Sequence, residues 1–114
     1  MADHIKIRPA SGTWSVRVAG AVLGETANAL ELSEGDYAPV VYFPRTDLAM
    51  AMFDQSDKTS VCPWKGTATY FSIDTGDGVL QDAAWSYEEP IEAVGEIAGH
   101  IAFYSNDDVT VEEL

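Results

Sequence analysis

Short stretches in which polar and apolar residues alternate recur along the chain, and a spacing of two is typical of β-strands with one buried face. Segments 4–8 and 13–18 alternate in this way, with turn-forming Pro and Gly between them. Segments 40–43 and 67–73 are rich in β-branched and aromatic residues, which favours strands. The pattern therefore predicts many short strands rather than a helical protein.

The middle of the chain predicts an antiparallel pair. Residues 74–78 contain two glycines and two aspartates, a composition typical of a hairpin turn, so residues 79–87 are expected to return beside 67–73. Residues 54–58 are polar and predict a loop. Periodicity does not separate a buried strand from one helical turn in a run as short as 48–53.

A helical pattern appears once, near residues 90–98. Pro90 is tolerated in a first helical turn, apolar residues follow at helical spacing, and Gly99 is a natural stop. Segments 100–104 and 109–112 alternate again as strands. The fold predicted for this mainly β chain is an antiparallel sandwich or partly open barrel with one short helix.

The 114 residues predict a single domain, 1–114. Nineteen acidic residues against six basic ones give a net charge of -13, and no Lys or Arg follows Lys65. Such a surface repels phosphate backbones and anionic lipid, so we expect neither nucleic acid nor membrane as a partner. The acidic surface favours solubility, while a salt-adapted host or a basic protein partner stays an alternative.

The first residues lack the apolar run of a signal peptide, and no stretch approaches the ~20 apolar residues that span a bilayer. We therefore expect a soluble, cytoplasmic protein.

Cys62 is the single cysteine, and Lys65 follows it closely. A nearby cation lowers a thiol pKa, and the thiolate is a nucleophile, so Cys62 is a candidate catalytic residue. The alternative is a small buried side chain with no chemistry. One cysteine also supplies too few ligands for a structural zinc site, so no metal is expected.

Arg45 and Lys65 are scarce cations placed at the ends of predicted strands, where loops often carry function. Held together, they would form an anion site. The alternative is that each pairs with a nearby acid. Asp47 and Glu88 are such acids, and they are also a candidate acid–base couple.

Aromatic residues gather in the same stretches. The candidates for an apolar wall with hydroxyl and indole groups that bind a ligand are Tyr42, Trp64, Tyr70, Trp85 and Tyr87. Trp85 and Tyr87 share one face of a strand by the period of two. The alternative is that these side chains form core. We expect the stretches 42–47, 59–70 and 84–90 to meet in space.

Four motifs occur in order over most of the chain: YFPRTD at 42–47, CPWKG at 62–66, AWSY at 84–87 and IAGHIAFY at 97–104. With these motifs the chain resembles the small proteins of the domain of unknown function four-two-seven family, which is sometimes labelled nucleotidyltransferase-like. The resemblance runs from about Trp14 to Val111. It implies a β-tent fold, similar to methionine sulfoxide reductase B and the Mss4-like zinc proteins.

Those fold relatives bind zinc through two Cys-x-x-Cys pairs, which this chain lacks. A Gly-rich phosphate loop and a paired Asp-x-Asp for magnesium are also absent from the sequence. We therefore expect no cofactor.

The sequence leaves three functions open. The first is binding of a small polar or anionic molecule by Arg45 and Lys65 over the aromatic wall. The second is an enzyme that uses Cys62 or the carboxylates of Asp47 and Glu88. The third is a homodimer formed through exposed strand edges, with no catalytic role.

Overall fold

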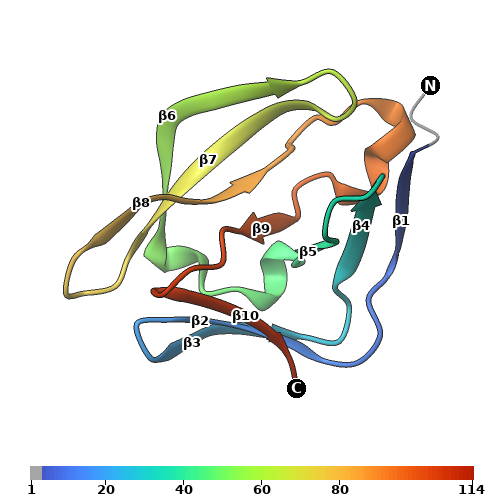
Figure 1. Cartoon of the computed structure of the whole chain (residues 1–114). Helices are drawn as coiled ribbons and strands as arrows, with labels where there is room; N and C mark the ends of the chain where they lie inside the picture. The colour runs from blue at the N-terminus through green and yellow to red at the C-terminus, as the bar shows by residue number, and fades with distance from the viewer. Residues whose placement is uncertain (1–3) are drawn as a thin grey trace.

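Three small antiparallel sheets make up the structure, a computed structural model that describes residues 4–114 (Figure 1). The mainly β prediction is confirmed, and none of these sheets closes into a barrel within the described residues. The chain passes from one sheet to another several times, so the first and second sheets each combine strands that lie far apart in sequence.

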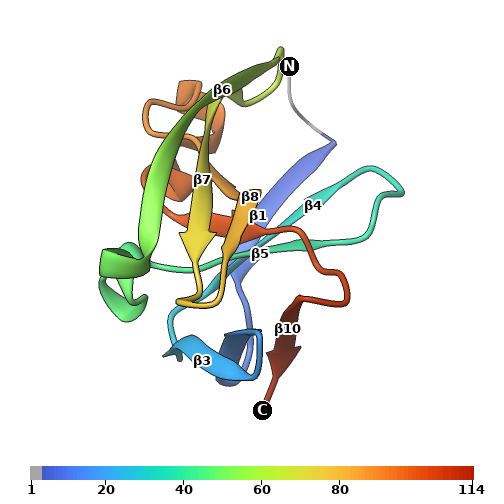
Figure 2. The ribbon, with the colours of Figure 1, turned by 90° about the vertical axis from the view of Figure 1, so that its left-hand side faces the viewer.

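The first sheet has the order β1-β4-β5 and the second the order β10-β2-β3. Their strands are β1 (Ile5–Pro9), β4 (Leu30–Glu34), β5 (Val40–Tyr42), β10 (Val109–Glu113), β2 (Trp14–Val18) and β3 (Ala21–Thr26). Figure 2 shows β4 and β5 as a hairpin whose connecting loop projects away from the third sheet.

The third sheet has the order β6-β7-β8-β9. It comprises β6 (Phe53–Cys62), β7 (Gly66–Asp74), β8 (Val79–Ser86) and β9 (Ile101–Phe103). The predicted hairpin across residues 74–78 is confirmed, because β7 pairs with β8. The two last predicted strands exist as β9 and β10, but they belong to different sheets.

The predicted loop at residues 54–58 is wrong, because β6 runs through it. β6 is an edge strand, and most of its side chains are exposed, so its sequence does not need an apolar face. Its pairing with β7 also shifts register between Gln55 and Thr59. The polar sequence of residues 54–58 therefore predicts correctly that their side chains are exposed, but it does not predict that their backbone forms a strand.

The helical segments are short 3-10 turns: η1 (Arg45–Asp47), η2 (Met50–Met52) and η3 (Glu92–Ile97). η3 confirms the short helix near residues 90–98, although Val94 departs from helical geometry with φ -122° and ψ 27°. η2 settles the choice at 48–53 in favour of a helical turn.

Two hydrophobic clusters form the core, and neighbouring residues of one segment enter different clusters. Phe43 is fully buried in the first cluster with Ile73 and Ile101, whereas Tyr42 is buried in the second with Ile97. Phe43 and Ile101 exchange backbone hydrogen bonds of 2.8 and 2.9 Å, which join the first sheet to the third. This junction fixes Tyr42 beside the tyrosines of the third sheet.

Within residues 4–114, no helix has the length and apolar character that a membrane crossing requires.

Candidate functional site

All five tyrosines of the chain line one pocket between the β4–β5 hairpin and the third sheet. We call it the tyrosine pocket, and its volume is about 230 Å³. Its lining residues are Leu32, Glu34, Tyr37, Ala38, Val40, Tyr42, Lys65, Tyr70, Trp85, Tyr87 and Tyr104. Of the predicted ligand-binding residues, this set includes Lys65, Tyr42, Tyr70, Trp85 and Tyr87, but neither Arg45 nor Trp64.

Strand periodicity explains how these side chains share a surface. Leu32 and Glu34 lie two residues apart on β4, and Val40 and Tyr42 lie two apart on β5. Because β4 and β5 are antiparallel, with Leu32 opposite Val40, these alternate positions form one face of the hairpin. Trp85 on β8 and Tyr87, one residue past the end of that strand, also line the pocket together.

Lys65 reaches the pocket from the tight turn between β6 and β7. Its backbone N–H donates to the carbonyl of Cys62, and its carbonyl accepts from Ile91 N–H. Gly66 follows with φ 117°, a left-handed value that favours glycine. Backbone atoms of residues 89–91 pack against Gly66, so the turn is held from both sides.

Lys65 and Glu34 form an ion pair in the pocket wall, with 2.6 Å between Nζ and Oε1. Their side chains are only 11% and 22% exposed, so water screens the pair less than a surface pair. His4 Nε2 lies 3.6 Å from the second oxygen of Glu34. The imidazole also packs edge-on against Trp64, which places His4 at the rim of this cluster.

The hydroxyls of Tyr42 and Tyr87 have raised pKa values. Burial raises the pKa of Tyr42 to about 12, and burial also raises the pKa of Tyr87. Tyr42 Oη accepts a hydrogen bond from Trp85 Nε1 at 3.4 Å, which leaves its own O–H without an acceptor among the described residues. Tyr87 Oη makes no hydrogen bond to any residue of 4–114. Both groups are therefore donors at neutral pH.

Tyr70 and Tyr104 form a second, linked pair. Burial tends to raise the pKa of Tyr70, but hydrogen bonds from Ser60 and Tyr104 and the Lys58 ammonium outweigh it, so that pKa is lowered. The Ser60 and Tyr70 hydroxyls lie 2.9 Å apart, and Lys58 Nζ lies 4.5 Å from the Tyr70 ring centroid. Burial and the bond to Tyr70 raise the pKa of Tyr104 to about 12.

A scan against protein-family models matches residues 6–113 to the Domain of unknown function (DUF427). The chain belongs to this family. No curated protein matches it.

In this DUF427 chain, Arg45 has its own partners away from the tyrosine pocket. Its Nη2 lies 2.6 Å from Glu88 and 3.3 Å from Ser86, and its Nε donates to the Gly99 carbonyl at 3.0 Å. The guanidinium also stands 5.5 Å from the centroid of the Phe71 ring. Arg45 thus ties η1 to the third sheet, and the two cations do not line one pocket.

The three predicted catalytic candidates of the DUF427 chain also lie outside the lining of the tyrosine pocket. Cys62 is half-buried and packs beside the second core cluster. Asp47 accepts a 2.7 Å hydrogen bond from Thr26, and Glu88 binds Arg45 and Ser86. Asp47 and Glu88 have different partners, and the catalytic roles of these residues stay a prediction.

Within the described part of this DUF427 chain, no group of three or more His, Cys, Asp or Glu side chains could hold a metal ion.

The expected meeting of the stretches 42–47, 59–70 and 84–90 is confirmed, since Arg45 binds Glu88, and Tyr70 pairs in register with Trp85.

Sequence reasoning missed Glu34, Tyr37 and Tyr104 as pocket residues. Glu34 ends β4 and lies two residues from Leu32, a spacing that is visible in the sequence. Tyr37 lies in a connection, where periodicity carries no signal, whereas Tyr104 closes the alternating segment 100–104 one residue past the end of β9. Counting the tyrosines as a set would have found them.

Proposed function

We propose that this protein binds a small molecule with an anionic or acceptor-rich polar head in the tyrosine pocket. The observation that carries the proposal is that three residues with donor groups, Lys65, Tyr42 and Tyr87, line one pocket. Hydrogen bonds from such donors are strongest toward charged acceptors. The raised pKa values of both tyrosines keep their protons available for donation.

The Glu34 carboxylate competes with the polar head of the ligand for Lys65. It is the one carboxylate in the lining and holds Lys65 at 2.6 Å. An incoming carboxylate or phosphate takes part of the Lys65 coordination, while the ring faces of Trp85 and Tyr104 cover the rest of the ligand. These rings pack against each other, with 4.5 Å between their centroids and 45° between their planes, and both line the pocket.

Thermal unfolding with acetate, benzoate, phosphate and sulfate at low ionic strength tests this proposal. A ligand that binds only the folded state raises its stability by mass action, by about 2.7 kcal/mol at a hundredfold excess over Kd. We expect at least one of these anions to raise the midpoint, and added sodium chloride to weaken the gain.

In the variants we compare the rise in unfolding midpoint that the anion causes, and not the midpoint itself, because Lys65→Met also breaks an ion pair. Lys65→Met and Tyr87→Phe should each reduce the anion-dependent gain. Lys6→Met removes the same charge from an exposed position on β1 and should leave the gain unchanged. If no anion stabilises the wild type, or if Lys65→Met and Tyr87→Phe keep the full gain, the proposal is wrong.

A further inference from the structure

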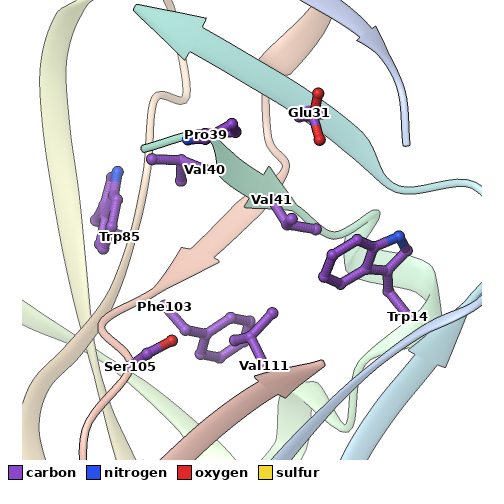
Figure 3. Close-up of a pocket in the computed structure, with 9 residues that line it drawn as sticks. All are labelled: Trp14, Glu31, Pro39, Val40, Val41, Trp85, Phe103, Ser105 and Val111. Carbon is purple, nitrogen blue, oxygen red and sulfur yellow. The ribbon is translucent and has the colours of Figure 1, made fainter. Parts of the chain in front are cut away.

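A second hollow lies where all three sheets meet. Its lining residues are Trp14, Glu31, Pro39, Val40, Val41, Trp85, Phe103, Ser105 and Val111, and its volume is about 340 Å³ (Figure 3). β2 and β10 contribute from the second sheet, β4 and β5 from the first, and β8 and β9 from the third. We call it the seam hollow.

Most residues in the walls of the seam hollow are apolar, and Glu31 and Ser105 are the exceptions. Trp14 donates its indole N–H to the Ser11 carbonyl at 3.0 Å, so the ring that faces the hollow has no free donor. Val41 and Val111 are only half-buried, although both pack against the first core cluster. Figure 3 shows Trp14 and Trp85 on opposite sides of this group.

The charge in the lining is already neutralised. Glu31 is the one ionisable residue there, and its Oε1 lies 2.7 Å from both Nε and Nη2 of Arg8. A ligand group that enters the hollow therefore meets mainly aromatic and aliphatic surface, with this ion pair and Ser105 as the polar part. Burial of apolar area is the interaction that this surface offers.

The seam hollow is next to the tyrosine pocket. Val40 and Trp85 line both. On β4, Glu31 points to the seam hollow and its neighbour Leu32 to the tyrosine pocket, so the two spaces lie on opposite faces of the β4–β5 hairpin. They meet at the start of β5, beside the Trp85 ring.

We propose that the seam hollow takes an apolar group, aryl or short alkyl, of the same ligand whose polar head occupies the tyrosine pocket. The ligand class is a small amphiphilic anion that crosses Trp85 and Val40. This inference rests on the proposed function, because it assigns the head to Lys65, Tyr42 and Tyr87.

Calorimetric titration with acetate, benzoate, phenylpropionate and phenylpentanoate tests the inference, because these probes share one carboxylate and differ in reach. Affinity should rise by about tenfold or more once the phenyl group reaches the hollow, since this is the gain expected from burying one such ring. Lys65→Met should weaken all four probes together.

Two variants close the hollow in different ways. Val111→Gln puts an amide among the apolar walls, and Ser105→Trp fills the space from an exposed position on the rim. Each variant should lose the higher affinity for the longer probes and should keep the affinity for acetate unchanged. Val22→Gln is the control for the substitution itself, because Val22 is an exposed valine of the second sheet that does not line the hollow.

The outcomes separate the two proposals. If acetate and benzoate bind through Lys65 but the longer probes gain nothing, the seam hollow is not part of the site and only this inference falls. The same conclusion follows if Val111→Gln and Ser105→Trp both leave the preference intact. If none of the four carboxylates binds the wild type, this inference falls, and the proposed function falls with it if phosphate and sulfate also leave the unfolding midpoint unchanged.

Discussion

Lys65 Nζ lies 2.6 Å from Glu34 Oε1, which joins the β6–β7 turn to the end of β4 across the tyrosine pocket. The two residues are 31 positions apart in sequence. The pair therefore has two roles: it fastens the first sheet to the third, and it presents a cation to the pocket.

Lys65→Met should destabilise the fold by about 2 kcal/mol. This value lies between the small effect of an exposed pair and the larger effect of leaving a buried charge alone. The combined change Lys65→Met with Glu34→Leu should recover much of that loss, because no carboxylate is then left unpaired. Urea unfolding measures both.

Arg17→Met is the comparison for this pair. Arg17 Nε lies 3.9 Å from Glu112, and both side chains are about half exposed, at 52% and 46%. Its loss should change the free energy of unfolding by less than about 0.5 kcal/mol. Equal losses for Lys65→Met and Arg17→Met would contradict the special position of Lys65.

Arg45→Met should weaken the fold without weakening anion binding. The variant loses the hydrogen bond to the Gly99 carbonyl and the pair with Glu88, which together contribute about 1 to 2 kcal/mol at this half-exposed site. Because Arg45 does not line the tyrosine pocket, the anion-dependent gain in midpoint should persist. Loss of that gain would restore the joint Arg45 and Lys65 site that the sequence suggested.

The fold should lose stability at alkaline pH. Folding raises the pKa of Tyr42 and Tyr104 from 10.0 to about 12, so the folded chain holds these protons more tightly than the unfolded chain. The resulting stability is full below pH 10 and is lost as the pH rises toward 12. Urea midpoints across this range measure the loss.

Tyr42→Phe removes one of the groups that titrate and should make the alkaline loss shallower. A midpoint that stays constant through that range would contradict the burial of these hydroxyls. Tyr70 should behave in the opposite way, since its pKa is lowered. The first phenolate absorbance to appear on titration should therefore disappear in Tyr70→Phe.

Gly24→Ala should destabilise the protein strongly. A Cβ at this position would overlap the backbone carbonyl of Asp47 and come within 2.8 Å of the Leu48 side chain. The strand β3 and the turn η1 would have to separate, so we expect a loss of about 2 kcal/mol or more. Thermal unfolding of the purified variant measures it.

Gly78→Ala is the matched control. No heavy atom lies within 4 Å of the Cβ that would be added there. Its effect on the midpoint should be small, and a reduced entropy of the unfolded chain favours a slight gain. Similar losses in both variants would mean that the close approach at Gly24 carries no special weight.

The strands that bury a face could be predicted from the sequence, because burial enforces alternation. β7 and β8 follow this rule, and the sequence predicted both with their hairpin. β6 could not be predicted in full, because an edge strand in water has no apolar face to reveal it. Which strands share a sheet, such as β10 with β2, depends on long-range pairing that local patterns do not encode.

The candidate site followed the same division. That Tyr42, Tyr70 and Trp85 line one surface could be predicted because they stand on strands with a clear period, and Tyr87 continues that period one residue past the end of β8. Arg45 and Lys65 looked equivalent in sequence, since both follow a corner. Their separation depends on which acid each one meets, Glu88 or Glu34, and only the packed sheets decide that.

The most direct test of ligand binding in the tyrosine pocket is a nuclear magnetic resonance titration of protein labelled at its tyrosine rings, with phenylpropionate as the probe. All five tyrosines line the pocket, so each ring reports on it. We predict saturable shifts of the Tyr42 and Tyr87 resonances, with the same apparent affinity as the calorimetric one, and their loss in Lys65→Met. Resonances that stay unmoved at saturating probe, or that move equally in Lys65→Met, would contradict the account.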